Sequence, residues 1–328
     1  MKKVLKFGVV IFVIGAFMAI IGAAFHGIKA IEFNGLHVRI AKEAKTIRKT
    51  YTSKEFSSLE VISPDFLPAK VKISQGDDYS VSYHGNALYE PKLRYQEGKL
   101  SINQSYADSY GRIDLTGNYP TSYGELTITV PKDKTLSELT VNGQGLDMFI
   151  NDIKTDKLVL DVNTAEDVSL TNVEAKKTDL TLDSDGVSLN NTHLADGSLS
   201  ITDGDLKVTR GELTNITVHS VGEGDVTYND GLILNGGSTH LEPEEDDDDE
   251  NGDLSATRVT VQGKYEMESV NGEIWVTNAN AQGYRLTSTE GKNTLFERSQ
   301  RNGGTLEENS DQTDVLNITN HLGDNTVK

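Results

Sequence analysis

The sequence contains no cysteine. This absence excludes disulfide bonds, a catalytic thiol and thiolate metal sites, and it is compatible with an exported bacterial protein that folds without oxidation. Basic residues are also few, because 31 Lys and Arg stand against 50 Asp and Glu, which gives a formal net charge of −19. A charge of this sign repels a phosphate backbone, so the composition predicts no nucleic-acid partner and favours cationic partners.

The usual signatures of catalysis and cofactor binding are missing as well. The seven histidines are scattered without metal-ligand spacing, and neither a Gly-x-Ser-x-Gly elbow nor a phosphate-binding glycine loop occurs. The sequence therefore predicts no enzyme activity and no cofactor. The enzymatic alternative is a carbohydrate-active β-solenoid, which needs acidic and basic side chains facing one another across adjacent coils, and the central repeats carry few basic residues.

One long hydrophobic run is present, from Phe7 to Phe25. As a helix at about 1.5 Å per residue, it gives close to the ~30 Å needed to cross a bilayer core. It predicts a transmembrane anchor at 7–25. The alternative is a signal peptide cleaved after Ala24, because Gly22 and Ala24 are small residues at the spacing that such a site requires. Both interpretations export the rest of the chain.

The lysines at the N-terminus indicate the orientation of this segment. Lys2, Lys3 and Lys6 precede the hydrophobic run, and positive charges next to a span favour the cytoplasmic side. The sequence therefore predicts a cytoplasmic N-terminus at 1–6, a juxtamembrane linker at 26–55, and a single-pass protein of the cell membrane whose C-terminal domain is extracellular.

From Phe56 onward the sequence has the alternation of short β-strands, as in "SLEVI", "KVKIS" and "ELTITV". We expect a β-rich region at 56–135, followed at 136–328 by repeats with a period of 19 to 20 residues. Each predicted repeat holds two apolar-x-apolar strands, because two columns of such pairs can be aligned. The first column is Leu139/Val141, Leu158/Leu160, Leu180/Leu182, Leu199/Ile201 and Ile216/Val218, and the second is Met148/Ile150, Val168/Leu170, Val187/Leu189, Leu206/Val208 and Val226/Tyr228.

Strand repeats of this period predict a parallel β-solenoid, because a single repeat cannot bury its apolar side chains and stacked repeats can. We expect "VLNITNHLGDNTV" near the C-terminus to be the closing coil. Glycine followed by an acidic residue precedes the second strand in several repeats, as in "TDGDLKV" and "NGEIWV". These carboxylates are predicted to accept turn amides. The similar "DSDG" at 183–186 lacks the later oxygen ligands of a calcium-binding loop.

The Gly-acid-apolar-x-apolar repeats, the segment "ELTITVPKDKTLSELTV" and the earlier "FSSLEVISPDFLPAKVKISQGDDYSVSYHG" resemble the bacterial "putative adhesin" β-strand-repeat family, a domain of unknown function. The resemblance covers about residues 55–328. LiaG-like members of that family are membrane-anchored envelope proteins associated with the response of Gram-positive bacteria to cell-wall and membrane damage. The resemblance implies the fold and an envelope location, and it carries over no catalytic or binding residue.

An acidic run interrupts the repeats at 242–253, where nine of the twelve residues of "EPEEDDDDENGD" are Asp or Glu. Repelling charges at this density bury nothing, so we expect a loop inserted between neighbouring coils. Two interpretations fit this run. It is a solvated insertion, or it is a weak sink for divalent cations or cationic peptides centred on Asp246, Asp247, Asp248 and Asp249.

Eight of the twelve tyrosines lie between Tyr79 and Tyr123. Tyrosine is favoured in strands for packing alone, and it is also common on surfaces that bind sugars or peptides. The candidate ligand face consists of Tyr106, Tyr110, Tyr119 and Tyr123.

Together these features predict a non-catalytic, membrane-anchored β-solenoid at the surface of the cell envelope, acting as a binding or scaffold protein in an envelope-stress response. Its predicted partners are the membrane, through the N-terminal helix, and an envelope protein, a cell-wall polymer or a cationic peptide. The alternative is a self-assembling structural solenoid, which needs an open terminal coil.

Overall fold

The computed structural model describes residue 12 and residues 31–34, 37–40, 45–64, 69–105, 111–113, 124–244, 251–301 and 303–328. Nearly all regular structure in the described residues from 31 onward is β-strand, and from residue 56 onward this agrees with the prediction. These residues include one 3₁₀ turn, η1 (Ala87–Tyr89). Within these ranges no helix is long and apolar enough to cross a membrane. The predicted anchor at 7–25 lies outside the described residues except for Phe12.

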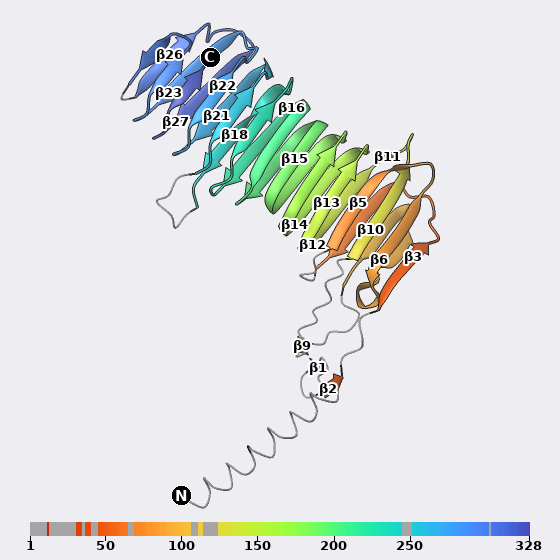
Figure 1. The fold of residues 1–328 in the computed structure, drawn as a ribbon. Helices are drawn as coiled ribbons and strands as arrows, with labels where there is room; N and C mark the ends of the chain where they lie inside the picture. Colours follow the sequence, from red (N-terminus) through yellow and green to blue (C-terminus); the bar gives the residue numbers. More distant parts are fainter. Residues whose placement is uncertain are drawn as a thin grey trace, which may run out of the picture.

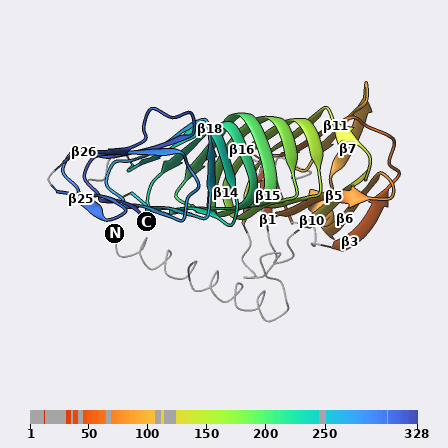
Figure 2. The same cartoon turned by 90° about the horizontal axis from the view of Figure 1, so that it is seen from above.

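A sheet of 25 strands winds into an elongated stack of coils (Figure 1). A coil is one complete turn of the chain, and neighbouring coils in the middle of the stack pair in parallel. Figure 2 shows the turns of β14, β15 and β16 lying side by side. The strands of this middle part are β11 (Thr135–Leu136), β12 (Glu138–Gln144), β13 (Leu146–Asn151), β14 (Lys154–Thr171), β15 (Glu174–Thr202), β16 (Asp205–Val221), β17 (Val226–Asn229) and β18 (Ile233–Glu242).

Each coil in the middle of the stack has three faces around a largely apolar core. Face A contains the inward-pointing Leu139 and Val141, face B contains Met148 and Ile150, and face C contains Ile153, all of which are buried. An apolar-x-apolar segment turns both side chains to the same side of a strand. Stacking the coils in register therefore gives a continuous apolar column along each face, and the columns meet inside the stack.

The column predicted for face B is confirmed. The parallel register places Met148 beside Val168, Val168 beside Val187, Val187 beside Leu206, and Leu206 beside Val226. These are the pairings that the sequence spacing of 19 to 20 residues predicts. The same strands therefore form the regular part of a parallel β-solenoid.

The column predicted for face A is wrong in register at two steps. Leu180 pairs with Leu160 rather than with Leu158, and Val218 pairs with Leu199 rather than with Ile201. A displacement of two residues keeps every side chain on its own side of the sheet. The hydrophobic pattern is therefore satisfied by either register, and the lengths of the corners decide between them.

The prediction of two strand segments per coil is also wrong. The coils in the middle of the stack have a third segment, which forms face C. This face is harder to recognise in the sequence because polar residues occupy some of its inward positions, among them Thr155 and Thr192, which are both buried. Its inward apolar residues are Leu136, Ile153, Val173, Leu194, Leu213, Leu232, Leu234, Val259 and Val261.

The Gly-acid steps form the corner before face B. The Oδ1 atom of Asp205 accepts a hydrogen bond from the backbone N–H of Asp225 at 3.0 Å, Asp225 Oδ1 accepts from Asp253 at 2.8 Å, and Asp253 Oδ1 accepts from Glu273 at 2.7 Å. The carboxylates accept backbone amides, as predicted. However, the amides belong to the adjacent coil, so the acids join coils rather than close their own turns.

Glycine is required at this corner by the close approach of neighbouring coils. A Cβ atom on Gly224 would lie 2.2 Å from the carbonyl oxygen of Gly204, and one on Gly252 would lie 2.1 Å from that of Gly224. Both distances are far below van der Waals contact. The repeated glycine therefore has a steric cause in the stacking of the coils.

The N-terminal end of the stack does not follow the order of the chain. Strands β4 and β5 lie against β12 and β13, β8 and β10 lie beyond them, and the antiparallel strands β7, β6 and β3 cover the end. Their bounds are β3 (Thr46–Tyr51), β4 (Ser58–Ser63), β5 (Ala69–Gly76), β6 (Ser80–Asn86), β7 (Lys92–Gln96), β8 (Lys99–Asn103) and β10 (Gly124–Pro131).

The C-terminal end is arranged in the same way. Strands β27 and β28 lie between β21/β22 and β23/β24, and the antiparallel strands β26 and β25 lie outermost (Figure 1). The bounds are β19 (Leu254–Thr257), β20 (Thr260–Gln262), β21 (Lys264–Ser269), β22 (Ile274–Thr277), β23 (Gly283–Ser288), β24 (Asn293–Leu295), β25 (Arg298–Gln300), β26 (Gly304–Glu308), β27 (Val315–Asn320) and β28 (Asn325–Val327). The segment predicted as the closing coil is therefore the penultimate one.

The segment 26–55, predicted as a linker, carries strands. β1 (Ile31–Asn34) pairs antiparallel with β2 (His37–Ile40) and with β9 (Gly111–Ile113) in a separate three-stranded sheet. β3 belongs to the main sheet through its antiparallel pairing with β6. The stack therefore begins at residue 46, ten residues before the predicted start of the β-rich region.

Candidate functional site

Most of the residues singled out from the sequence lie outside the described part of the chain. This holds for Asp246, Asp247, Asp248 and Asp249 and for Tyr106, Tyr110, Tyr119 and Tyr123. The ends of the acidic run are described. Glu242 ends β18 on face A, and Asp253 precedes β19 on face B. The run is therefore inserted at the corner between these two faces.

Of the described tyrosines in the Tyr79–Tyr123 region, Tyr79, Tyr83 and Tyr95 pack in or against the core. The Tyr79 ring lies 4.7 Å from that of Phe56, centroid to centroid. Tyr83 is buried, its hydroxyl donates to the carbonyl oxygen of Asn86 at 2.9 Å, and burial raises its pKa to about 12. In the ranges that the structure describes, no group of three or more His, Asp or Glu side chains is placed to hold a metal ion.

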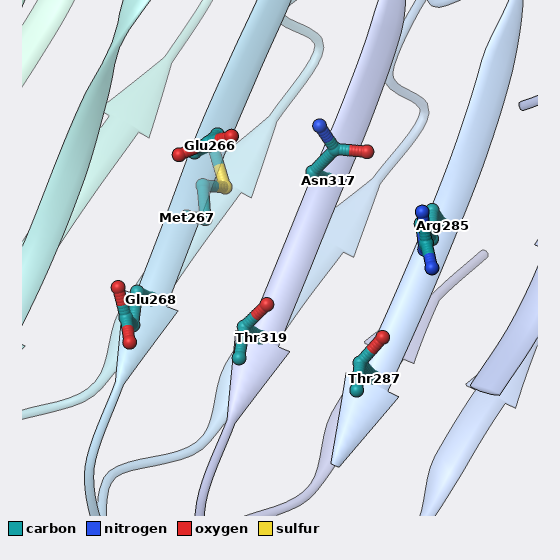
Figure 3. Close-up of a pocket in the computed structure, with 7 residues that line it drawn as sticks. All are labelled: Glu266, Met267, Glu268, Arg285, Thr287, Asn317 and Thr319. Carbon is teal, nitrogen blue, oxygen red and sulfur yellow. The ribbon is translucent and has the colours of Figure 1, made fainter. Parts of the chain in front are cut away.

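The structure instead reveals a polar hollow of about 310 Å³ on face A of the C-terminal coils. Three neighbouring strands line it: β21 contributes Glu266 and Glu268, β27 contributes Asn317 and Thr319, and β23 contributes Arg285 and Thr287, with the buried Met267 behind them. Figure 3 shows the six polar side chains in three parallel rows.

The hollow exists because short side chains lie between longer ones. Register pairing aligns Glu266 with Asn317 and Asn317 with Arg285. The short side chains of β27 form the floor, while glutamates form one wall and an arginine the other (Figure 3). The alternation that places Met267 in the core turns its two neighbours outward.

Charged groups around the hollow hold its walls in place. Glu268 lies between two histidines, with Oε2 2.9 Å from Nδ1 of His240 and Oε1 3.4 Å from Nε2 of His321. On the opposite wall, Nε of Arg285 lies 3.1 Å from Oε1 of Glu307. All three contacts are partly exposed, so each contributes little to stability, and their role is to orient the side chains.

The arrangement offers a shallow surface rich in hydrogen-bonding groups. The floor supplies an amide and hydroxyl groups, which both donate and accept, and the walls supply acceptors on one side and donors on the other. A surface of this kind suits a polar ligand that lies along or across the strands.

Little in the sequence pointed to this site. Its three strands occupy positions 264–269, 283–288 and 315–320, and β23 and β27 are neighbours only because the end of the chain is inserted one coil inward. The only sequence pattern shared by these lining residues is an outward polar residue between two inward apolar residues, as in "YEMES" and "YRLTS". That signal occurs in almost every strand of the solenoid and cannot single out these three.

A family model described as Toastrack DUF4097 matches residues 61–328. This match confirms the family resemblance that the strand repeats indicate. No curated protein matches the chain.

Among solved structures, the chain is similar to a "putative adhesin" from Parabacteroides distasonis ATCC 8503, with 15% identity, a TM-score of 0.45 and coverage of 87% of this chain and 98% of that one. A "putative adhesin" from Bacteroides fragilis NCTC 9343 has 14% identity and a TM-score of 0.39, with coverage of 87% and 97%. A "putative lipid binding protein" from Parabacteroides distasonis ATCC 8503 has 11% identity and a TM-score of 0.35, with coverage of 86% and 97%.

Proposed function

Since the chain belongs to the Toastrack DUF4097 family, we propose a function that rests on its solenoid: a non-catalytic binding or scaffold protein, anchored by residues 7–25 at the outer surface of the Gram-positive cell envelope. The proposal includes a role in the response to envelope stress. Ligand binding is assigned to the long sides of the stack, and the hollow on face A is its first candidate site.

The covering of both ends carries this proposal. Antiparallel β3, β6 and β7 lie over the N-terminal coils, and antiparallel β25 and β26 lie over the C-terminal ones. An open terminal coil would present unpaired backbone groups to another copy. Ends that the chain covers with its own reversed strands favour binding along the sides over end-to-end assembly of copies.

Location is tested first, by adding protease to protoplasts that carry the full chain with a C-terminal tag. We expect rapid loss of the tag, because the solenoid lies outside the cell. A tag that is protected until the membrane is permeabilised would contradict the envelope-surface proposal. Increased abundance of the protein after treatment with a cell-wall antibiotic is the expected sign of a stress role.

Binding is tested by crosslinking in intact cells, followed by purification of the tagged full-length chain. We expect a specific partner or polymer, and weaker recovery with Glu266→Ala or Arg285→Ala if the hollow takes part. Thr181→Ala, an exposed residue of face A in the middle coils, is the matched control. Purified chain that releases reducing ends from envelope polysaccharides would contradict the non-catalytic part of the proposal.

A further inference from the structure

Exposed large hydrophobic residues are concentrated at the C-terminal end of the stack. Among the described residues from 45 onward, the three are Trp275, Leu322 and Phe296, with 58%, 51% and 41% of their surface exposed. Trp275 is also the only tryptophan of the sequence. Tryptophan is highly buried on average, so placing the single one on an outward position of β22 leaves most of its ring without a packing role.

Trp275 interrupts a row of hydroxyl side chains on the outside of face B. The strand registers align one residue from each of six adjacent strands, and five of the six carry a hydroxyl group. In spatial order they are Thr227, Ser255, Trp275, Thr326, Thr294 and Ser299. Adjacent members are one strand spacing apart, ~4.8 Å, so the row extends over roughly 24 Å. It is a flat, uncharged strip with one aromatic ring within it.

The indole is held in position, and three acidic residues near the row already accept hydrogen bonds. Nε1 of Trp275 donates to Oε2 of Glu273 at 2.6 Å. Two residues before the row, Asp225 and Asp253 accept backbone amides of the next coil. A ring fixed by its edge presents its surface to a ligand without a large loss of side-chain entropy on binding.

We propose that this strip binds an uncharged, linear, β-linked polysaccharide of the cell's own envelope. The indole stacks on the apolar C–H face of a sugar ring, and the Ser and Thr hydroxyls, which donate and accept, pair with sugar hydroxyls that do the same. The inference rests on the proposed function, because that function makes the sides of the solenoid its binding surface and the anchor brings them to the envelope.

Other partners fit this surface less well. A stable protein interface buries about 800 Å² on each partner around an apolar core, whereas the apolar residues here are three single side chains. An anionic lipid surface calls for clustered Lys and Arg, whereas the strip is uncharged. The residues that immediately precede β17, β19 and β22 are Asp225, Asp253 and Glu273. An uncharged glycan needs neither feature.

The single tryptophan makes the test specific. Full-length chain in detergent is titrated with chitohexaose and, separately, with cellohexaose while its fluorescence is recorded. We expect a saturable change in emission with at least one of them, because all tryptophan signal arises from the proposed contact. Since the ligands are uncharged, raising the salt from about 0.1 M to about 0.5 M should leave the affinity unchanged.

Variants measured by calorimetry complete the experiment. Trp275→Ala should weaken binding about tenfold or more, and Trp275→Phe should recover part of it, because a smaller ring still stacks. Thr181→Ala, at an exposed residue of face A in the middle coils, should bind like the parent chain. Absence of a saturable signal with both hexasaccharides, or equal affinity after Trp275→Ala, overturns the proposal.

The two proposals fail in different experiments. Glycan binding by a solenoid that protoplasts protect from protease would remove the envelope-surface function and leave the Trp275 site. An accessible solenoid whose crosslinked partner is a protein, with no glycan binding, would remove the Trp275 site and leave the function.

Discussion

The middle coils and the C-terminal coils are both built from stacked strands, but only in the middle coils do the strands follow one another in space in the order of the chain. In the middle, spatial neighbours are 19 or 20 residues apart, and the left-handed corner residues Asp152, Asn172 and Asn191 repeat their contact: Asn172 Nδ2 donates to Asp152 Oδ1 at 2.7 Å, and Asn191 Nδ2 donates to Asn172 Oδ1 at 2.8 Å. At the C-terminal end, β21 pairs with β27, about 50 residues further along the chain. Local repetition is enough where chain order and spatial order agree, and it is not enough where the chain doubles back.

Buried polar groups mark the place where the order changes. Asn320, on the inserted strand β27, donates from Nδ2 to the carbonyl oxygen of Gly272 at 2.6 Å. Asn325, the first residue of β28, donates from Nδ2 to Oδ1 of Asn293 at 2.8 Å. All three asparagines are fully buried. A buried amide that loses its partner costs about 1–3 kcal/mol. These contacts therefore favour the one order of strands that satisfies them over other stackings of equally apolar strands.

The largest effect is expected from a charge in the middle core. Leu182→Asp places an unpaired carboxylate among buried aliphatic side chains, because Leu182 is 1% exposed, and the expected loss of unfolding free energy is more than about 4 kcal/mol. Thr181→Asp, one residue away and exposed, should change it by less than about 0.5 kcal/mol. Chemical denaturation measures both. Similar midpoints for the two variants would show that the inward and outward positions of face A are misassigned.

A smaller effect is expected from the buried hydroxyls next to the C-terminal coils. Thr239 Oγ1 lies 2.8 Å from the hydroxyl of Tyr228 and 2.8 Å from that of Tyr265, and all three side chains are buried. Thr239→Val keeps the shape and leaves the two tyrosines without this partner, so we expect a loss of about 1–3 kcal/mol. The exposed Thr181→Val should be nearly silent. If Thr239→Val is silent as well, buried polar groups do not distinguish this region from the middle coils.

The smallest effect is expected from the Glu174–Lys154 ion pair of the middle coils, whose contribution to stability is lost at low pH. A hydrogen bond and ion pair with Lys154, 2.6 Å away, hold the pKa of Glu174 below its ordinary 4.5. A lowered folded-state pKa contributes stability above the unfolded pKa, and this contribution is lost as the pH falls through the lower folded value. Both side chains are more than half exposed, so solvent screening keeps the contribution small.

Melting temperatures of the parent chain and Glu174→Gln measure this contribution. We expect Glu174→Gln to melt slightly lower at pH 7. The difference should disappear as the pH falls through the lowered folded-state pKa of Glu174, because the protonated carboxyl is then neutral, like the amide of the glutamine. Glu166→Gln, at an exposed residue of the neighbouring strand β14, is the control. A difference that persists unchanged at low pH would assign the effect to packing rather than to charge.

The periodic middle part of the stack could be predicted from the sequence, and the surfaces of the C-terminal coils could not. Residues 158–228 predicted an all-β parallel solenoid and one correct column, because Val168, Val187 and Leu206 repeat at the spacing of one coil. The register of face A was not predictable from the apolar residues, since Leu158 and Leu160 satisfy the same side of the strand. The hollow was not predictable at all, because Glu268 and Arg285 are brought to one surface by a strand from residues 315–320.

The sequence by itself determined the local chemistry: strands that alternate apolar and polar residues, glycine before an acidic residue at one corner, and enough repeats to bury every apolar column. These properties depend on residues within one coil of each other, so a periodic sequence expresses them directly. The tertiary structure alone decided which strands are neighbours at the two ends. There β4 and β5 at one end, and β27 and β28 at the other, are inserted one coil inward. The choice depends on contacts between residues far apart in the chain, such as Asn320 with Gly272. The same insertion places Thr326 beside Trp275 and Asn317 beside Glu266, so both candidate binding surfaces result from tertiary packing.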